Sequence, residues 1–255
     1  MKAETHKRIQ DFVSENIGTF HKARLARILK LTLADILRRK NPYLFRAKNL
    51  NAAPDLVASI LDAYLSSSEE ELFGQFLEEL AIFVSGITLD GQKSAAEGLD
   101  LELTKGGTRY IIAIKSGPNW GNSSQYKDLR LRFKNAVRVL KQSRRTKHVQ
   151  PVLGICYGKF KTRNTGEYLK IGGQSFWHLI SGDPNLYVDI IEPLGHEAKR
   201  HNDAYLAEKD RAYNLFTKQF IDDFCDAVGR IDWRKLVEFN SANLTAATKT
   251  RSVGT

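Results

Sequence analysis

Two acidic residues and one lysine occupy what reads as a β-hairpin, in an arrangement that suits hydrolysis of a phosphodiester bond. Asp100 and Glu102 fall in a predicted strand over residues 98–104, and the apolar strand that follows, over 108–115, ends on Lys115. Burying an unpaired ammonium group is costly, so a lysine at this position needs a reason. A carboxylate beside it holds a divalent cation that polarises a phosphate and activates water, while the lysine offsets the developing charge.

Whether Asp100, Glu102 and Lys115 form such a site depends on whether the hairpin lies on the surface or inside the sheet. Asp100 and Glu102 are two residues apart, so their side chains share one face of a strand, and a solvated strand face is the simpler interpretation. The partner strand Tyr110–Ile114 is apolar on both faces, which predicts a strand inside the sheet. Lys115 follows that strand directly, and its simpler interpretation is a lysine reaching to solvent at a strand end. The buried partner strand favours a site.

Composition narrows the class of protein. The chain has 255 residues and a net charge of +10, which favours a polyanionic partner, nucleic acid first and an anionic membrane surface second. No apolar run approaches the roughly 20 residues of a membrane span, and the charged start MKAETHKRIQ lacks a secretory signal. Cys156 and Cys225 are too few for a four-cysteine zinc site and predict reduced thiols in the cytoplasm.

The elements that must position the hairpin follow from hydrophobic periodicity. We expect a helical start over 1–40, a helix stop at Asn41-Pro42, and Ser66–Ser68 capping a helix over 69–84. Further helices are predicted over 125–144, 175–181, 196–228 and 233–240, with further strands over 149–157 and 168–171; residues 186–191 fit either. The prediction is an α/β fold with a central mixed sheet flanked by helices. Its regions are a helical N-terminal part (1–65), a core (66–240) and a disordered tail (241–255).

Several strings carry a resemblance to a known group of enzymes. Asp100 followed by a hairpin and Lys115 resembles the PD-(D/E)xK nuclease superfamily, and the string AIKSGPNWGNSSQ over 113–125 is similar to type II restriction endonucleases of the PmeII group. Similar to that group as well are NPYLF (41–45), FGQFLEE (73–79) and GGQSFW (172–177), so the resemblance covers most of residues 41–180.

This resemblance implies the fold, the chemistry and the partners. It implies a restriction-endonuclease-like core that uses Mg²⁺ to cut a specific, palindromic site in double-stranded DNA as a homodimer, with a cognate DNA methyltransferase protecting the host. Asp100 would bind the metal, the carbonyl of Ile114 would add a neutral oxygen, and Lys115 would orient the attacking water. Two rivals stay open: a repair or junction nuclease of the same superfamily, and a non-catalytic DNA-binding protein on the same fold.

The chain departs from the superfamily pattern at Ala113, where an acid is expected two residues before the lysine. Another carboxylate must supply that metal ligand. Around the helix over 69–84, Glu79 lies at the edge of the apolar arc and Glu78 nearly opposite, so Glu79 is predicted to reach the sheet. Glu70 and Glu102 are the alternatives, and a solvated boundary glutamate is the simpler interpretation of Glu79.

Two groups of residues are predicted to contact DNA. The helix over 125–144 carries positive side chains three and four residues apart, which repel each other unless phosphates neutralise them, although many such stripes are merely solvated. Side chains suited to base edges or phosphates lie in the loop before this helix and in the basic segment 159–170. The predicted contacts are Lys127, Arg130, Lys134, Arg138, Lys141 and Arg145 in the stripe, Asn119, Asn122, Ser123, Ser124 and Gln125 in the loop, and Lys161, Arg163 and Asn164 in the basic segment.

Overall fold

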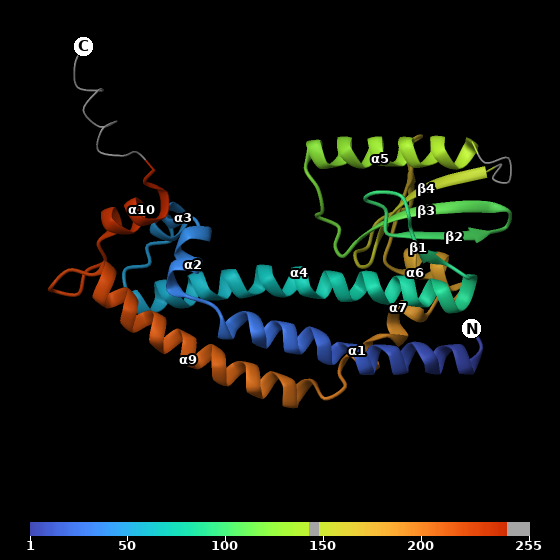
Figure 1. Ribbon diagram of the computed structural model, residues 1–255. Coiled ribbons are helices and arrows are strands. Elements are labelled where there is room, and N and C mark those ends of the chain that lie inside the picture. The colour runs from blue at the N-terminus through green and yellow to red at the C-terminus, as the bar shows by residue number, and fades with distance from the viewer. Residues whose placement is uncertain (143–147, 244–255) are drawn as a thin grey trace, which may run out of the picture. The chain divides into compact units, whose positions relative to one another are not determined.

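The computed structural model describes residues 1–142 and 148–243 (Figure 1). This part of the chain forms two compact units, each built from separate stretches of sequence. The first unit contains residues 1–20 and 71–198, and the second contains residues 21–70 and 199 onward. Two long helices, α1 (Ala3–Leu29) and α4 (Ala53–Leu89), contribute to both units.

A six-stranded mixed sheet forms the centre of the first unit, in the order β1-β2-β3-β4-β6-β5. Strands β3, β4 and β6 run parallel, and the remaining neighbours pair antiparallel. The strands are β1 (Gln92–Lys93), β2 (Leu101–Lys105), β3 (Thr108–Lys115), β4 (His148–Ile155), β5 (Arg163–Asn164) and β6 (Leu169–Gly172).

Helices cover both faces of this sheet, and this confirms the predicted fold class. Helix α5 (Ser123–Gln142) packs on one face through Leu129, Phe133 and Ala136. On the other face lie the first-unit parts of α1 and α4 and helix α6 (Gln174–Ser181) (Figure 1). Because both faces are covered, the buried residues of β3 and β4 are apolar on both faces, as the sequence predicted for the hairpin's second strand.

The strand register brings three strand ends to one edge of the sheet. Lys115 at the end of β3 pairs with Ile155 at the end of β4, which in turn pairs with Gly172 at the end of β6. Short helices α7 (Leu186–Asp189) and α8 (Ile191–Leu194) follow α6, so residues 186–191 are helical. Side chains at this edge therefore come from segments far apart in sequence.

The second unit is helical around its own core. It adds α2 (Leu33–Arg39), α3 (Pro42–Ala47), α9 (Ala198–Phe224) and α10 (Trp233–Ser241), which enclose residues such as Ile36, Leu56 and Phe220. Helix α2 ends at Arg39, just before the helix stop predicted at Asn41-Pro42, and α3 begins there. Thr32 forms a capping box with Asp35, and Asn41 caps α3 ahead of Pro42.

Helix α4 corrects the predicted start at Ser66–Ser68. The helix runs unbroken over 37 residues, with the three serines inside it. Their hydroxyls find partners without ending the helix: Ser67 donates to the carbonyl of Ala63, four residues earlier, and Ser68 accepts from Arg27. In the part of the chain that the structure describes, α4 is the one helix long and apolar enough to cross a membrane. Its buried residues pack in the cores of both units.

The two units also differ from the contiguous regions expected from sequence. Residues 1–20 pack with the sheet through Ile9, Val13 and Ile17, whereas α9 and α10 belong to the helical unit. A contiguous division misses this because the partners of α1 and α9 are distant in sequence. Within the predicted tail, Ser241 ends α10, and residues 244–255 lie outside the described residues.

One buried ion pair ties the hairpin strands together. The Glu102 carboxylate accepts from Nε of Arg109 at 3.1 Å and from its Nη2 at 2.5 Å, and it also accepts from the hydroxyl of Ser94 at 2.6 Å. The Glu102 side chain is 7% exposed. Glu102 is thus occupied by structural partners.

We expect Arg109→Met to lower the free energy of unfolding by about 3 kcal/mol, because it leaves a buried carboxylate without its cation. Denaturant titration measures this change. The control is Lys7→Met, which removes an exposed pair with Asp11 and should cost less than about 1 kcal/mol. Equal losses for the two variants would contradict a structural role for the Glu102 pair.

Candidate active site

Asp100 is fixed at the sheet edge by its own carboxylate. Its Oδ2 accepts a hydrogen bond from the N–H of Ile114 at 2.6 Å, and its N–H donates to the carbonyl of Ile112 at 2.9 Å. Strand β2 begins at Leu101, opposite Ile112, so the backbone ladder has ended where Ile114 lies. The side chain of Asp100 takes the place of the next backbone acceptor, and this orients the carboxylate beside the end of β3.

The surroundings of Asp100 favour a cation. Burial raises the pKa of its carboxyl group above the ordinary value, and the N–H of Ile114 and the charges of Lys115, Lys93 and Arg132 offset only part of that rise. A carboxylate that has lost solvation gains more from a bound cation than one in water does. Asp100 therefore has the electrostatic character of a metal ligand.

Glu78, and not Glu79, is the glutamate of α4 that lies close to this carboxylate. Burial raises the pKa of Glu78, the charge of Asp100 raises it further, and the charge of Lys115 acts in the opposite direction. Glu78 is half-buried and Glu79 is exposed. The helical phase used to prefer Glu79 is wrong, because the buried arc of α4 extends to Ala81, which the apolar pattern left out.

The other two alternatives for the second carboxylate are placed elsewhere. Glu102 is held by Arg109 and Ser94, and Glu70 belongs to the second unit. Ala113, at the position of the missing acid, is fully buried in the core beneath α5. An apolar side chain therefore fills the strand position, and the candidate second acid, Glu78, comes from a helix.

Lys115 stands beside both carboxylates. Its charge acts on Glu78 and on Asp100, and its Nζ lies 5.2 Å from the ring centroid of Trp120. The aromatic face holds the ammonium group without neutralising it. The lysine thus lies at the edge where the carboxylates meet.

Three oxygen donors at this edge are the candidates for holding a metal ion. Within the described residues, no group of three or more His, Cys, Asp and Glu side chains is arranged to hold a metal ion. Asp100 and Glu78 offer two carboxylates, and the carbonyl of Ile114 points to the same side of β3 as its N–H, toward Asp100. Magnesium needs few protein oxygens because it retains several waters.

Cys156, one residue beyond β4, is close to the same carboxylates but plays no ionic part. Burial, with further contributions from Glu78 and Asp100, raises the pKa of its thiol to about 12. The thiol is therefore neutral at physiological pH and serves as a small apolar group.

The loop residues predicted to contact DNA build the start of α5. The Asn122 side-chain oxygen accepts from the N–H of Gln125 at 3.1 Å and from the hydroxyl of Ser124 at 2.7 Å. Gln125 returns a bond by accepting from the N–H of Asn122 at 2.9 Å. These three side chains cap the helix, and Asn119 and Ser123 are exposed. DNA contact by the five residues stays a prediction.

The basic stripe of α5 lies on the surface, as its spacing predicted. Lys127, Lys134, Arg138 and Lys141 are exposed, and Leu129, Phe133 and Ala136 are buried on the opposite side. Arg130 is half-buried, with its Nε 3.5 Å from the carboxylate of Glu167. Arg145 lies outside the described residues.

The basic segment forms a small hairpin at the far edge of the sheet. Lys161, Arg163 and Asn164 are exposed, and Arg163–Asn164 make up strand β5. The Asn164 side chain accepts from the N–H of Gly166 at 2.9 Å, which shapes the turn into β6. Arg163 remains a candidate for base contacts.

Sequence reasoning missed a second lysine at the sheet. Lys170 of β6 is half-buried, and its Nζ lies 5.8 Å from the ring of Tyr126 and 5.5 Å from that of Phe160. Lys170 lies inside a strand between the apolar residues Leu169 and Ile171, whereas Lys115 ends one. A lysine in an apolar strand was therefore visible in the sequence here too. Lys93 of β1, whose charge acts on both Glu78 and Asp100, carried no comparable signal.

Sequence comparison identifies the family. The model of the type II restriction endonuclease EcoO109I family matches residues 7–202 of the 255. The chain belongs to this family. No curated protein matches the chain.

Membership in the EcoO109I family makes the chain a type II restriction endonuclease and therefore a DNA-directed nuclease. The match includes Glu78, Asp100 and Lys115. The narrower resemblance to the PmeII group is not confirmed by this match and stays a prediction.

We expect Asp100→Asn to stabilise the metal-free protein at neutral pH. The folded-state pKa of Asp100 is raised above its ordinary value of 3.8, so its charge destabilises the fold at pH values above both, and asparagine keeps the acceptor for Ile114. Each kcal/mol regained raises the melting temperature by about 2–4 °C in a chain of this size.

Melting curves of wild type and Asp100→Asn over a pH series test this expectation. The difference should be largest at neutral pH and should shrink as the pH falls toward 3.8, because the folded wild type takes up its proton above that value. A difference that grows as the pH falls would contradict the conclusion that burial raises the pKa of Asp100.

Proposed function

We propose that this member of the EcoO109I family cleaves both strands of a specific, palindromic double-stranded DNA site with Mg²⁺. The observation that carries the proposal is the convergence of Asp100, Glu78 and Lys115 at one edge of the sheet. Two desolvated carboxylates beside a charged lysine are what metal-assisted phosphodiester hydrolysis requires.

Each residue of the site has a separate part in this chemistry. Asp100, Glu78 and the carbonyl of Ile114 hold the ion, which supplies Lewis acidity and a lowered pKa for water when bound. Lys115 donates hydrogen bonds to the attacking water or to a phosphate oxygen and stabilises the negative charge that develops there. Trp120 keeps the lysine at the edge through its ring face.

DNA binding divides between phosphate and base contacts in this proposal. The α5 stripe Lys127, Arg130, Lys134 and Arg138 contacts phosphates, which gives affinity without sequence preference. Lys161, Arg163, Asn164 and Asn119 are exposed and are the proposed base readers or their flanking contacts. Asn122, Ser124 and Gln125 contribute by holding the first turn of α5.

A two-fold homodimer is part of the same proposal. One site cuts one strand, so a palindrome is cut in both strands most simply by two copies related by two-fold symmetry. A DNA methyltransferase that modifies the same sequence would protect the host, and cleavage of foreign DNA places the enzyme in the cytoplasm.

Glu78→Gln, Asp100→Ala and Lys115→Ala should each lower the cleavage rate by about 100-fold or more, because each removes a metal ligand or a charge at the phosphate. Glu79→Gln should cleave at nearly the wild-type rate, because Glu79 is exposed. The measurement is magnesium-dependent cleavage of a long plasmid, with sequencing of the ends to define the site.

The neighbouring variants Glu78→Gln and Glu79→Gln control for helix stability, since both make the same change on α4. Loss of activity in Glu79→Gln with retention in Glu78→Gln would reverse the assignment. Tight, specific binding without cleavage by the wild type would indicate a non-catalytic DNA-binding protein. Cleavage confined to branched DNA would indicate a junction nuclease.

Replacing Arg130, Lys134 and Arg138 together with glutamine should weaken binding to cognate and random duplexes in parallel. The slope of log affinity against log salt should fall by roughly three, one for each phosphate that the variant no longer neutralises. Binding titrations over a salt series measure both effects.

A matched control removes the same charge elsewhere. Lys199→Gln, Arg211→Gln and Arg234→Gln together change the net charge equally but lie on α9 and α10. An equal decrease of slope in this control variant, or an unchanged slope in the stripe variant, would make the stripe a solvated surface.

A further inference from the structure

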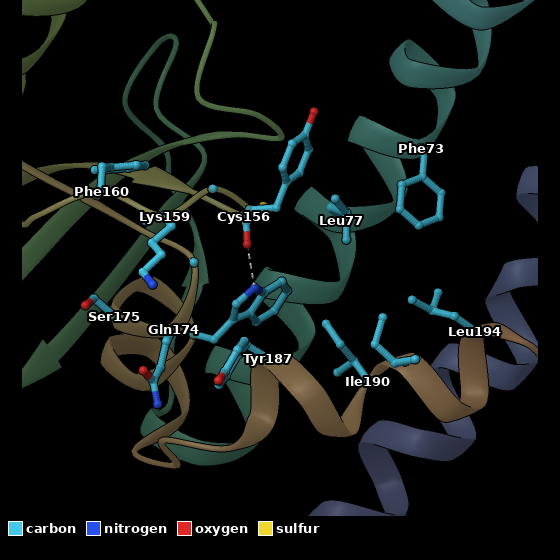
Figure 2. Close-up of a pocket in the computed structure, with 16 residues that line it drawn as sticks. Phe73, Leu77, Cys156, Lys159, Phe160, Gln174, Ser175, Tyr187, Ile190 and Leu194 are labelled. Atoms are coloured by element: carbon cyan, nitrogen blue, oxygen red, sulfur yellow. Dashed lines mark hydrogen bonds between the residues drawn. The ribbon is translucent and has the colours of Figure 1, made fainter.

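A pocket of about 640 Å³ opens next to the candidate active site in the first unit (Figure 2). It begins at Cys156 and Tyr157, whose N–H groups donate to the carbonyls of Lys115 at 2.9 Å and Ser116 at 3.1 Å. Neighbouring strands lie about 4.8 Å apart, so the pocket starts one strand away from the proposed catalytic lysine. Its volume falls within the range of pockets that hold small organic ligands.

The walls of the pocket differ in chemistry. Phe73, Leu77, Ile190 and Leu194 line one side, and Lys159, Phe160, Gln174 and Ser175 line the other (Figure 2). The first side is wholly apolar, whereas the second combines an aromatic ring with a charge, an amide and a hydroxyl. A ligand that fits both sides is flat and apolar on its faces and carries hydrogen-bonding groups at its edge.

The floor of the pocket is closely packed, and the indole N–H of Trp177 in it already has a hydrogen-bond partner. Trp177 is buried, and its indole N–H donates to the carbonyl of Cys156 at 2.9 Å. Gly172 and Gly173 admit no side chain, since a Cβ at Gly172 would overlap the ring of Phe160 and one at Gly173 would lie 2.8 Å from the carbonyl of Gly158. The cavity is therefore built into the packing of two loops.

Large apolar side chains remain exposed around the opening. Tyr157, Tyr187 and Ile191 line the pocket with 48%, 40% and 65% of their surface exposed. Exposed aromatic rings beside a pocket are groups on which unstacked bases can rest. Lys159 at the same opening suits the phosphate that such a base would bring with it.

We propose that this pocket takes one base of the DNA substrate, rotated out of the duplex near the scissile phosphate. This inference rests on the proposed function, because only a DNA substrate brings a nucleotide to Lys115. The base lies between apolar side chains of α4 and α8 and the aromatic rings of Phe160 and Tyr187. Its polar edge meets Gln174 and Ser175. Selection of that base adds specificity which the residues of β5 do not provide.

The test uses the fact that unpairing costs less where a base is already unpaired. Once cleavage has defined the site, each base pair in and beside it is replaced in turn by a mismatch, and binding is measured with calcium in place of magnesium. At one position per half-site the wild type should bind the mismatched duplex about tenfold or more tightly than the matched one. At other recognised positions a mismatch should weaken binding.

Two abasic duplexes separate a captured base from a merely flexible duplex. Removing the partner base at that position should preserve the gain, because the captured base is then unpaired. Removing the captured base itself should abolish the gain, because nothing is left to enter the pocket. Equal gains for the two abasic duplexes would show that only flexibility is sensed and would overturn the proposal.

Variants of α7 connect the effect to the pocket. Tyr187→Ala should reduce the mismatch gain about tenfold by removing a stacking ring, and Tyr187→Phe should retain it. Val188→Ala is the matched control, since Val188 is exposed on the same helix and does not line the pocket.

If the wild type cuts plasmid at a defined site but no position gains from a mismatch, the pocket proposal fails while the proposed function stands. A gain that survives in Tyr187→Ala at wild-type size also overturns the pocket proposal.

Discussion

The hydrogen bond from the N–H of Ile114 to the carboxylate of Asp100 is the interaction on which the site depends. It ends the β2–β3 ladder with a side chain instead of a backbone group, and it does so at the edge where β3, β4 and β6 also end. The carboxylate is placed by the sheet itself, so its position is as rigid as the strands. The same placement removes it from water and raises its pKa, which makes a cation there favourable.

The fold was largely predictable because its signals are local. The apolar run before Lys115 and the amphipathic pattern of α5 each specify an element without knowledge of its partners. The division into units was not predictable, since α1 and α9 find their partners across long stretches of sequence. The serines inside α4 misled because a hydroxyl that caps a helix start can equally bond to a carbonyl one turn back.

For the site, sequence reasoning located Asp100 and Lys115 at one edge but placed the glutamate of α4 one residue away from the position that the structure favours. Successive residues on a helix differ by 100°, and the centre of the buried arc shifts when a weakly apolar residue such as Ala81 is counted. Lys170 was missed for a different reason. A lysine in an apolar strand is informative only when the neighbouring strands are known.

The position of Glu78 on α4 has a consequence for the proposed site. A strand acid and its lysine two residues later are kept in phase by the pleat alone, whereas Glu78 keeps its direction through the packing of Leu77, Leu80 and Ala81 in the first-unit core. One residue inserted between Glu78 and Leu80 would turn the glutamate by 100° relative to Leu80 and Ala81 and yet leave every residue of the Asp100–Lys115 segment unchanged. The spacing of Glu78 from these buried residues is therefore as necessary to the proposed site as its carboxylate is.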